Sequence, residues 1–185
     1  MITVVSGLPR SGTSLMMQIL EAGGMQILTD NIRKPDENNQ RGYYEYEKVK
    51  SLQKDNSWLN EAEGKVIKVI AQLLPYLPSN LNYSIIFVER NIDEVFLSQK
   101  KMISNLSGKQ SSVSDEILKK TFLSQIEKIK NLLKQSPRVV YVNHRDLLEK
   151  GKEIITSLNT SLNLNLDLEA AYSVIDPDLY RAKLF

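Results

Sequence analysis

A short strand, a glycine-bounded loop and a helix follow one another at the start of the chain, and this order constrains the fold more than any other feature. Residues 2–5 are β-branched and precede a glycine, which is typical of a buried parallel strand. Apolar side chains then recur at helical spacing over residues 15–20, before two consecutive glycines. Residues 7–14 therefore join a strand to a helix, the position at which parallel sheets bind phosphate groups.

Strand and helix signals alternate along the rest of the chain. Besides the opening elements, the sequence predicts strands over residues 65–70, 83–90 and 138–142, the last as a central strand, and helices over residues 43–52, 115–134, 150–158 and 168–174, with another helix beginning near residue 92. This alternation implies a parallel sheet covered on both faces. We expect an α/β fold with three layers, α/β/α, a central parallel sheet and an N-terminal P-loop-like strand, loop and helix, in a single domain over residues 1–185.

Two polar segments interrupt this alternation. Residues 30–42 contain Pro35 and several asparagines without an apolar period, so we expect a long loop of the kind that covers a binding site. Residues 100–114 are rich in lysine and serine, and the sequence predicts an exposed, mobile stretch there.

Composition excludes several classes of protein. With 42% hydrophobic and 25% charged residues the chain is an ordinary globular protein, and a net charge of +2 is too small for a nucleic-acid or membrane-surface protein. Cysteine is absent, which removes disulfides, thiol nucleophiles and cysteine-based metal sites. The apolar N-terminal run is short and has no basic leader, so we expect a cytoplasmic protein without nucleic-acid or membrane partners, and a homo-oligomer is left open.

The loop at residues 7–14 has the chemistry of a phosphate site. Its glycines permit close approach of the backbone, its amides point at an anion, and Arg10, Thr13 and Ser14 add charge and hydroxyl groups. The pattern Gly-x-x-x-x-Gly-Thr-Ser has the frame of a nucleoside-triphosphatase P-loop, but Thr13 stands where that motif requires lysine. An ordinary ATPase or GTPase is therefore disfavoured.

Two segments together resemble a known family. Residues 8–14 resemble the 5′-phosphosulfate loop of sulfotransferases that use 3′-phosphoadenosine 5′-phosphosulfate (PAPS), and Arg90, followed eight positions later by Ser98, resembles the pair that binds the 3′-phosphate in that family. The resemblance implies that the cofactor-binding residues are Pro9, Arg10, Ser11, Gly12, Thr13, Ser14, Arg90 and Ser98.

A third, weaker resemblance covers residues 65–75, which are similar to the family segment that carries a catalytic lysine and histidine. Lys68 falls on the lysine, but Ile70 stands at the histidine position. A C-terminal Gly-x-x-Gly-x-x-Lys segment of the family has no match here, and Arg181 and Lys183 are the candidates for its charge.

The resemblance thus implies a short, bacterial-type PAPS-dependent sulfotransferase. Such an enzyme would transfer a sulfuryl group to a hydroxyl or amine of a small-molecule or saccharide acceptor, release 3′-phosphoadenosine 5′-phosphate (PAP) and need no metal. Two alternatives stay open: a P-loop kinase-like phosphotransferase, and a nucleotide-binding protein without catalysis.

With isoleucine at the histidine position, a carboxylate is the expected general base. Asp36, Glu37, Glu45 and Glu47 are the candidates, and aromatic neighbours that could raise a carboxyl pKa favour Glu45. The rival interpretation is that Glu45 and Glu47 simply occupy the first turn of a helix. His144, the only histidine, is expected to have a structural role. The predicted catalytic residues are therefore Arg10, Glu45 and Lys68.

Overall fold

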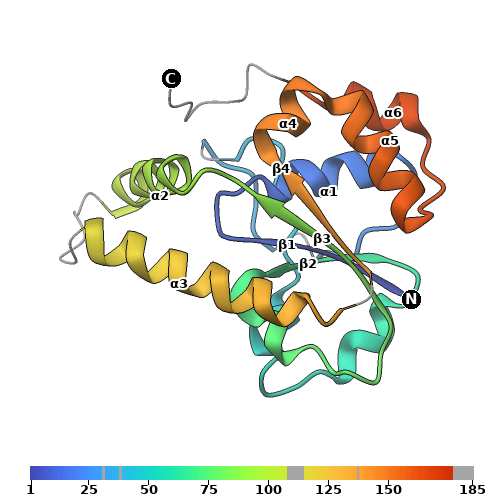
Figure 1. Cartoon of the computed structure of the whole chain (residues 1–185), viewed down its shortest axis with the longest axis horizontal. Coiled ribbons are helices and arrows are strands. Elements are labelled where there is room, and N and C mark those ends of the chain that lie inside the picture. The colour runs from blue at the N-terminus through green and yellow to red at the C-terminus, as the bar shows by residue number, and fades with distance from the viewer. Residues whose placement is uncertain (31, 38, 108–114, 137, 177–185) are drawn as a thin grey trace.

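The protein is built on a four-stranded sheet in which all strands run parallel (Figure 1). The computed structural model describes residues 1–30, 32–37, 39–107, 115–136 and 138–176. The strands β1 (Ile2–Gly7), β2 (Val66–Ile70), β3 (Tyr83–Glu89) and β4 (Val139–Asn143) lie in the order β2-β1-β3-β4. Gly7, the last residue of β1, is paired with Ile70 and with Val88, so these strands end at the same level.

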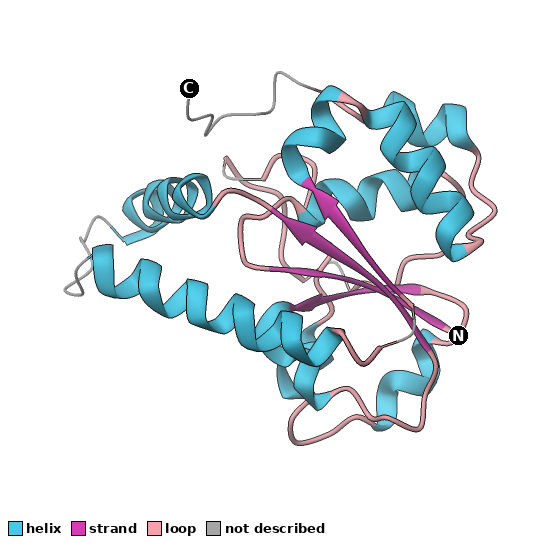
Figure 2. Cartoon of the chain, in the orientation of Figure 1, coloured by secondary structure: helices cyan, strands magenta, loops and turns pink. Residues whose placement is uncertain are grey.

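Helices cover both faces of this sheet (Figure 2). One face carries α1 (Thr13–Ala22), α4 (His144–Glu149), α5 (Gly151–Leu162) and α6 (Leu168–Ser173). The other carries the 3-10 helices η1 (Glu47–Ser51), η2 (Ser57–Ala62) and η3 (Ala71–Tyr76), together with α2 (Ile92–Ser107) and α3 (Asp115–Leu133). The expected α/β/α arrangement with its N-terminal strand, loop and helix is confirmed.

The sequence patterns explain the two cores. β1 is buried along its whole length because it lies between two other strands with helices on both faces. Its side chains alternate between the layers, so that Val4 belongs to one core and Val5 to the other. The apolar stripe at residues 16–20 of α1 is fully buried, apart from the polar Gln18, and fixes the start of this helix against the end of β1.

The structure differs from the expectations in three places. Residues 100–107 belong to α2 rather than to an irregular stretch, although Lys100 and Lys101 are exposed as expected, and residues 108–114 lie outside the described residues. Lys100 and Lys101 lie on the outside of α2, and Lys100 pairs with Asp115 of α3. The helix expected over residues 43–52 shortens to η1, because Tyr44 adopts a left-handed backbone with φ 54°. β4 is an edge strand rather than a central one.

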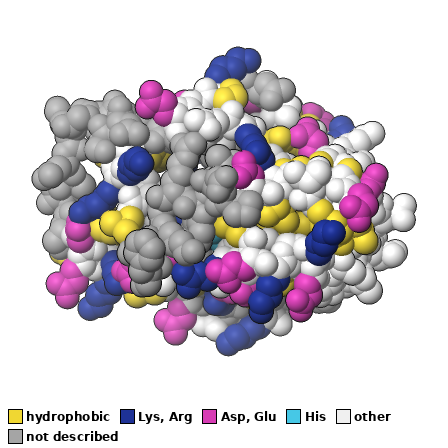
Figure 3. Space-filling model, turned by 90° about the horizontal axis from the view of Figure 1, so that it is seen from above, with side chains coloured by type: hydrophobic (Ala, Val, Ile, Leu, Met, Phe, Trp, Pro, Cys, Tyr) yellow, Lys and Arg dark blue, Asp and Glu magenta, His cyan; other side chains and the backbone are white. Residues whose placement is uncertain are grey.

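The surface matches the small net charge. Figure 3 shows one face on which lysine and arginine side chains are interspersed with aspartate and glutamate. Within the described parts of the chain, no helix combines the length and the apolar character that a membrane span requires.

Candidate phosphate-binding site

A cavity of about 450 Å³ opens at the carboxyl ends of β1, β2 and β3, a size within the range of small-molecule sites. Its walls are the loop between β1 and α1 (the phosphate loop, residues 7–14), the end of β2, α2, and a covering loop over residues 30–46, of which the structure describes all but 31 and 38. The cavity lining includes these residues expected from the sequence: Pro9, Arg10, Gly12, Thr13, Ser14, Glu45, Lys68, Arg90 and Ser98.

Ser11 is the one residue of the expected set that is not part of this lining. Its side chain is buried beneath the phosphate loop, and a Cβ added to Gly7 would lie 2.4 Å from the Ser11 Oγ. The hydroxyl therefore points into the protein, and Ser11 can offer a ligand only its backbone amide in this conformation.

The backbone of the phosphate loop is held in a demanding conformation. Arg10 has φ 72° and Gly12 has φ 105°, both in the left-handed region that most side chains avoid. Gly12 is also required by packing, because a Cβ there would lie 2.2 Å from Cδ2 of His144. Left-handed residues in a turn direct successive amides toward one concave side, which favours an anion.

Arg10 is held from two directions, by Arg90 directly after β3 and by Ser98 of α2. Its Nε donates a hydrogen bond to Ser98 Oγ over 2.9 Å, and its carbonyl accepts one from Arg90 Nη1 over 3.1 Å. Arg90 in turn pairs with Glu94 at 3.0 Å, and the two side chains are only 9% and 4% exposed. Glu94 and Ser98 lie one turn apart on the same face of α2, and Arg90 just before this helix pairs with Glu94; we call Arg90, Glu94 and Ser98 the Arg10 clamp.

Lys68 points from β2 toward the start of α1. Its Nζ donates to Ser14 Oγ over 3.4 Å. Burial lowers the pKa of Lys68 to about 8, against a smaller raising effect of Glu45 and together with a lowering effect of Arg33. Two residues further along β2, Ile70 is 43% exposed and lines the cavity, so an apolar side chain stands where the family resemblance expects histidine.

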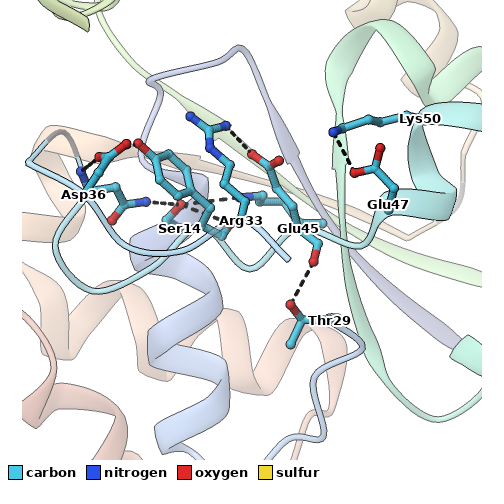
Figure 4. Close-up of polar contacts among 10 residues, drawn as sticks. Ser14, Thr29, Arg33, Asp36, Glu45, Glu47 and Lys50 are labelled. Atoms are coloured by element: carbon cyan, nitrogen blue, oxygen red, sulfur yellow. Dashed lines mark hydrogen bonds and ion pairs between the residues drawn. The ribbon is translucent and has the colours of Figure 1, made fainter. Parts of the chain in front are cut away.

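Glu45 reaches the cavity as an ion-paired carboxylate (Figure 4). Arg33 Nη1 donates to Glu45 Oε1 over 2.7 Å, and the Arg33 guanidinium lies 3.4 Å from the centre of the Tyr43 ring. The neighbour that the structure gives Glu45 is therefore a cation rather than the aromatic surroundings expected from the sequence.

The other carboxylate candidates for the base lie outside this lining, among the residues that the structure describes. Asp36 accepts a hydrogen bond from the Tyr43 hydroxyl over 2.6 Å, and exposed Glu47 pairs with Lys50 at 2.7 Å. Glu47 lies in the first turn of η1, as the rival interpretation expects, whereas Glu45 precedes that helix.

His144 lies under the phosphate loop at the start of α4 and is 7% exposed. Burial lowers the pKa of His144 to about 4; the Arg90 charge lowers it further and Glu94 raises it. The imidazole is therefore neutral at neutral pH. Its contact with Gly12 agrees with the structural role expected from the sequence, although the ring also borders the cavity.

Sequence reasoning missed Arg33, the partner of Glu45, and three further residues of the site. Asn39 Nδ2 donates to Ser14 Oγ over 3.0 Å, Arg41 binds the Val174 carbonyl at 2.8 Å, and Glu94 holds Arg90. The polar composition of residues 30–42 indicated a covering loop, but no motif marks which of its side chains turn inward. Arg181 and Lys183, the candidates for the missing C-terminal charge, lie outside the described residues.

Comparisons with known proteins add little. No model of a known protein family matches the chain, and no curated protein matches it. A crystal structure of an unliganded sugar kinase from Janibacter sp. HTCC2649 aligns with 13% sequence identity and a TM-score of 0.46, over 94% of this chain and 97% of that one. Similarity at this level carries no argument about fold or activity, so the site's own geometry has to support any functional conclusion.

Proposed function

We propose that the protein is a transferase that binds a nucleotide, and specifically a PAPS-dependent sulfotransferase acting on a hydroxyl or amine of a small-molecule or saccharide acceptor. The observation that carries this proposal is the Arg10 clamp. It joins the phosphate loop to Arg90 and Ser98, so the two segments that resemble the family meet in one cavity. The positions of the phosphate loop and of Arg90 and Ser98 in the sequence do not by themselves require these segments to lie together.

The lining offers separate groups for the two ends of the nucleotide. The phosphate-loop amides, Thr13 and Ser14 suit the 5′ group, while Arg90 and Ser98 suit the 3′-phosphate. Arg10 lies between them, bonded to both members of the second pair. Hydrogen bonds from cationic donors are about twice as strong as neutral ones, which favours a ligand with several charged oxygens.

Bound PAPS would supply an activated sulfuryl group. Residues of the chain would neutralise the charge of the leaving phosphate and take up the proton of the acceptor. Transfer of the sulfuryl group to the acceptor would break its bond to the 5′-phosphate oxygen and leave negative charge on that phosphate. Arg10 and Lys68 neutralise that charge. Glu45, a carboxylate of the cavity lining, would act as the general base: it would leave its ion pair with Arg33 and accept the proton of the acceptor.

One observation favours a second candidate, a kinase-like phosphotransferase. Lys68 Nζ reaches Ser14 and so brings an amine to the phosphate loop from β2, although Thr13 replaces the lysine of the usual motif. Phosphoryl transfer from ATP would use the same loop together with a divalent metal.

A transfer assay tests the proposal. The full chain is incubated with PAPS labelled in its sulfur, without divalent metal, and with a panel of phenols, alcohols, amines and saccharides. The proposal expects label on at least one acceptor, with an equal amount of PAP released, and no label with the Arg10→Ala variant. Transfer from γ-labelled ATP instead favours the phosphotransferase, and binding of PAP without transfer to any acceptor favours a non-catalytic protein.

A further inference from the structure

Asn39 of the covering loop contacts the phosphate loop directly. Its Nδ2 donates to Ser14 Oγ over 3.0 Å. The same oxygen accepts from Lys68 Nζ at 3.4 Å and donates toward the Tyr43 carbonyl at 3.5 Å. The Ser14 hydroxyl is therefore the point at which the covering loop, β2 and α1 meet, and Figure 4 shows Ser14 between Asp36 and Glu45 of that loop.

Backbone hydrogen bonds fix the position of Asn39. Its amide donates to the carbonyl of Asp36 at 3.1 Å and to the Asp36 carboxylate at 3.0 Å. Its carbonyl accepts from the amides of Asp36 at 3.3 Å and Gly42 at 3.2 Å. The side chain is thus delivered by a tight turn, and little conformational entropy is lost when it binds a ligand.

Contacts on both sides anchor this turn to the protein. The Tyr43 hydroxyl donates to Asp36 over 2.6 Å, and Arg33 covers the Tyr43 ring. Arg41 binds the Val174 carbonyl and, at 3.0 Å, the carboxylate of Asp176. These contacts hold the covering loop over the cavity.

The groups around Ser14 suit an anion. The bond from Ser14 to the Tyr43 carbonyl, at 3.5 Å, lies at the limit of a hydrogen bond, so a charged oxygen would compete for this hydrogen. The Asn39 amide has two N–H donors, and only one can point at Ser14. An oxygen that enters beside Ser14 would therefore also meet an amide donor and the Lys68 amine.

We propose that Asn39 is an anion-binding residue of this site, placed with Ser14 and Lys68 to bind the oxygens of the 5′ phosphosulfate group. The nature of the natural ligand rests on the proposed function, whereas the contact with an anion rests on the geometry around Ser14. Inorganic pyrophosphate has a similar array of oxygens and no nucleoside, so it probes the contact by itself.

Calorimetric titration of the full chain with pyrophosphate and with PAP tests this role. Asn39→Asp keeps the size of the side chain but replaces its N–H donors with a negative charge, so pyrophosphate binding should weaken roughly a hundredfold. Asn39→Ala, which removes the donor without adding charge, should lose roughly tenfold. Asn60→Asp makes the same charge change on η2, away from the cavity, and should bind like the wild-type protein.

The outcomes separate this role from the alternatives. If Asn39 only stabilises the loop, Asn39→Ala and Asn39→Asp lose stability to urea by similar amounts, and their affinities for pyrophosphate equal one another. That result overturns the proposal. Wild-type affinity in Asn39→Asp also overturns it. If the wild-type protein binds pyrophosphate but not PAP, the sulfotransferase assignment is refuted, and the pyrophosphate affinities of the variants alone decide the role of Asn39. If it binds neither ligand, both the sulfotransferase assignment and the role of Asn39 are refuted.

Discussion

Arg10 and Ser98 lie 88 residues apart in the sequence and are joined by a hydrogen bond of 2.9 Å from Nε to Oγ. This bond brings the first strand-to-helix loop against the helix that follows β3. Because Arg90 binds the carbonyl of the same arginine, the ends of β1 and β3 carry one continuous set of donors. The ligand expected at such a place has two separated anionic groups.

The Arg10 clamp predicts that different residues bind the two phosphates of PAP. Arg90→Ala should weaken PAP binding at least tenfold, because it removes a charge-assisted contact worth roughly 1.5 to 3 kcal/mol. Arg145→Ala is a matched control, since Arg145 lies outside the cavity and pairs with Glu149 on the surface. Calorimetry with AMP, which lacks the 3′-phosphate, should show a smaller loss for Arg90→Ala. An equal loss for both nucleotides contradicts the assignment of Arg90 to the 3′-phosphate.

Lys68 should make PAP binding depend on pH. Its pKa of about 8 in the free protein means that the amine is increasingly neutral above pH 8. A bound anion favours the ammonium form, so binding takes up a proton and the affinity should fall about tenfold between pH 7 and pH 9. Calorimetry in two buffers with different ionisation enthalpies measures the proton uptake. Lys68→Met should bind more weakly with no proton uptake in this range, and an unchanged uptake in that variant would show that another group is responsible.

His144 should make the fold sensitive to acid. Its pKa is about 4 in the folded protein and 6.5 in an unperturbed side chain, so the unfolded chain binds more protons between these values. Stability is therefore lost as the pH falls from 6.5 toward 4, by about 2 kcal/mol at pH 4.5 from this residue. Urea unfolding at pH 7 and pH 4.5 measures the loss, and His144→Asn should lose less by that amount. A variant with the same acid dependence as the wild type would remove His144 from this account.

Glu45 should affect turnover and not nucleotide binding. Once an acceptor is known, Glu45→Gln should lower turnover by about 10² to 10⁴, the range typical of general-base loss, with PAP affinity nearly unchanged. Glu47→Gln removes a similar carboxylate outside the cavity and should keep normal activity. Near-normal turnover in Glu45→Gln, beside an inactive His144→Asn or Glu37→Gln enzyme, moves the base to the damaged residue.

The sequence predicts those parts of the site that local patterns encode. A β-branched run followed by glycines marks the phosphate loop. A buried strand followed by a helix cap places Arg90 and Ser98, and the Asn91 side chain does accept a hydrogen bond from the Asp93 amide at the start of α2. What spacing cannot encode is the choice between partners of similar chemistry. Arg33 could equally have paired with Glu47 as with Glu45, and only the left-handed Tyr44 and the path of the covering loop decide.

Long-range packing accounts for the other differences. The order of the strands depends on which crossover passes over which neighbour, so nothing within residues 138–142 marks β4 as an edge strand. Exposed lysines give the end of α2 the composition of a loop, because one side of this helix faces solvent at Lys100 and Lys101. Asn39 has no sequence signal, because its role depends on Ser14 being within 3.0 Å.

The central claim is that the cavity recognises a nucleotide with both a 5′ group and a 3′-phosphate, and calorimetric titration of the wild-type chain with PAP, AMP and ATP in the presence of chelator tests it most directly. The account predicts that PAP binds without divalent metal and at least tenfold more tightly than AMP, because only PAP reaches both the phosphate loop and the Arg90–Ser98 pair. Equal affinity for PAP and AMP, or tight binding of ATP that appears only when magnesium is added, would contradict the claim.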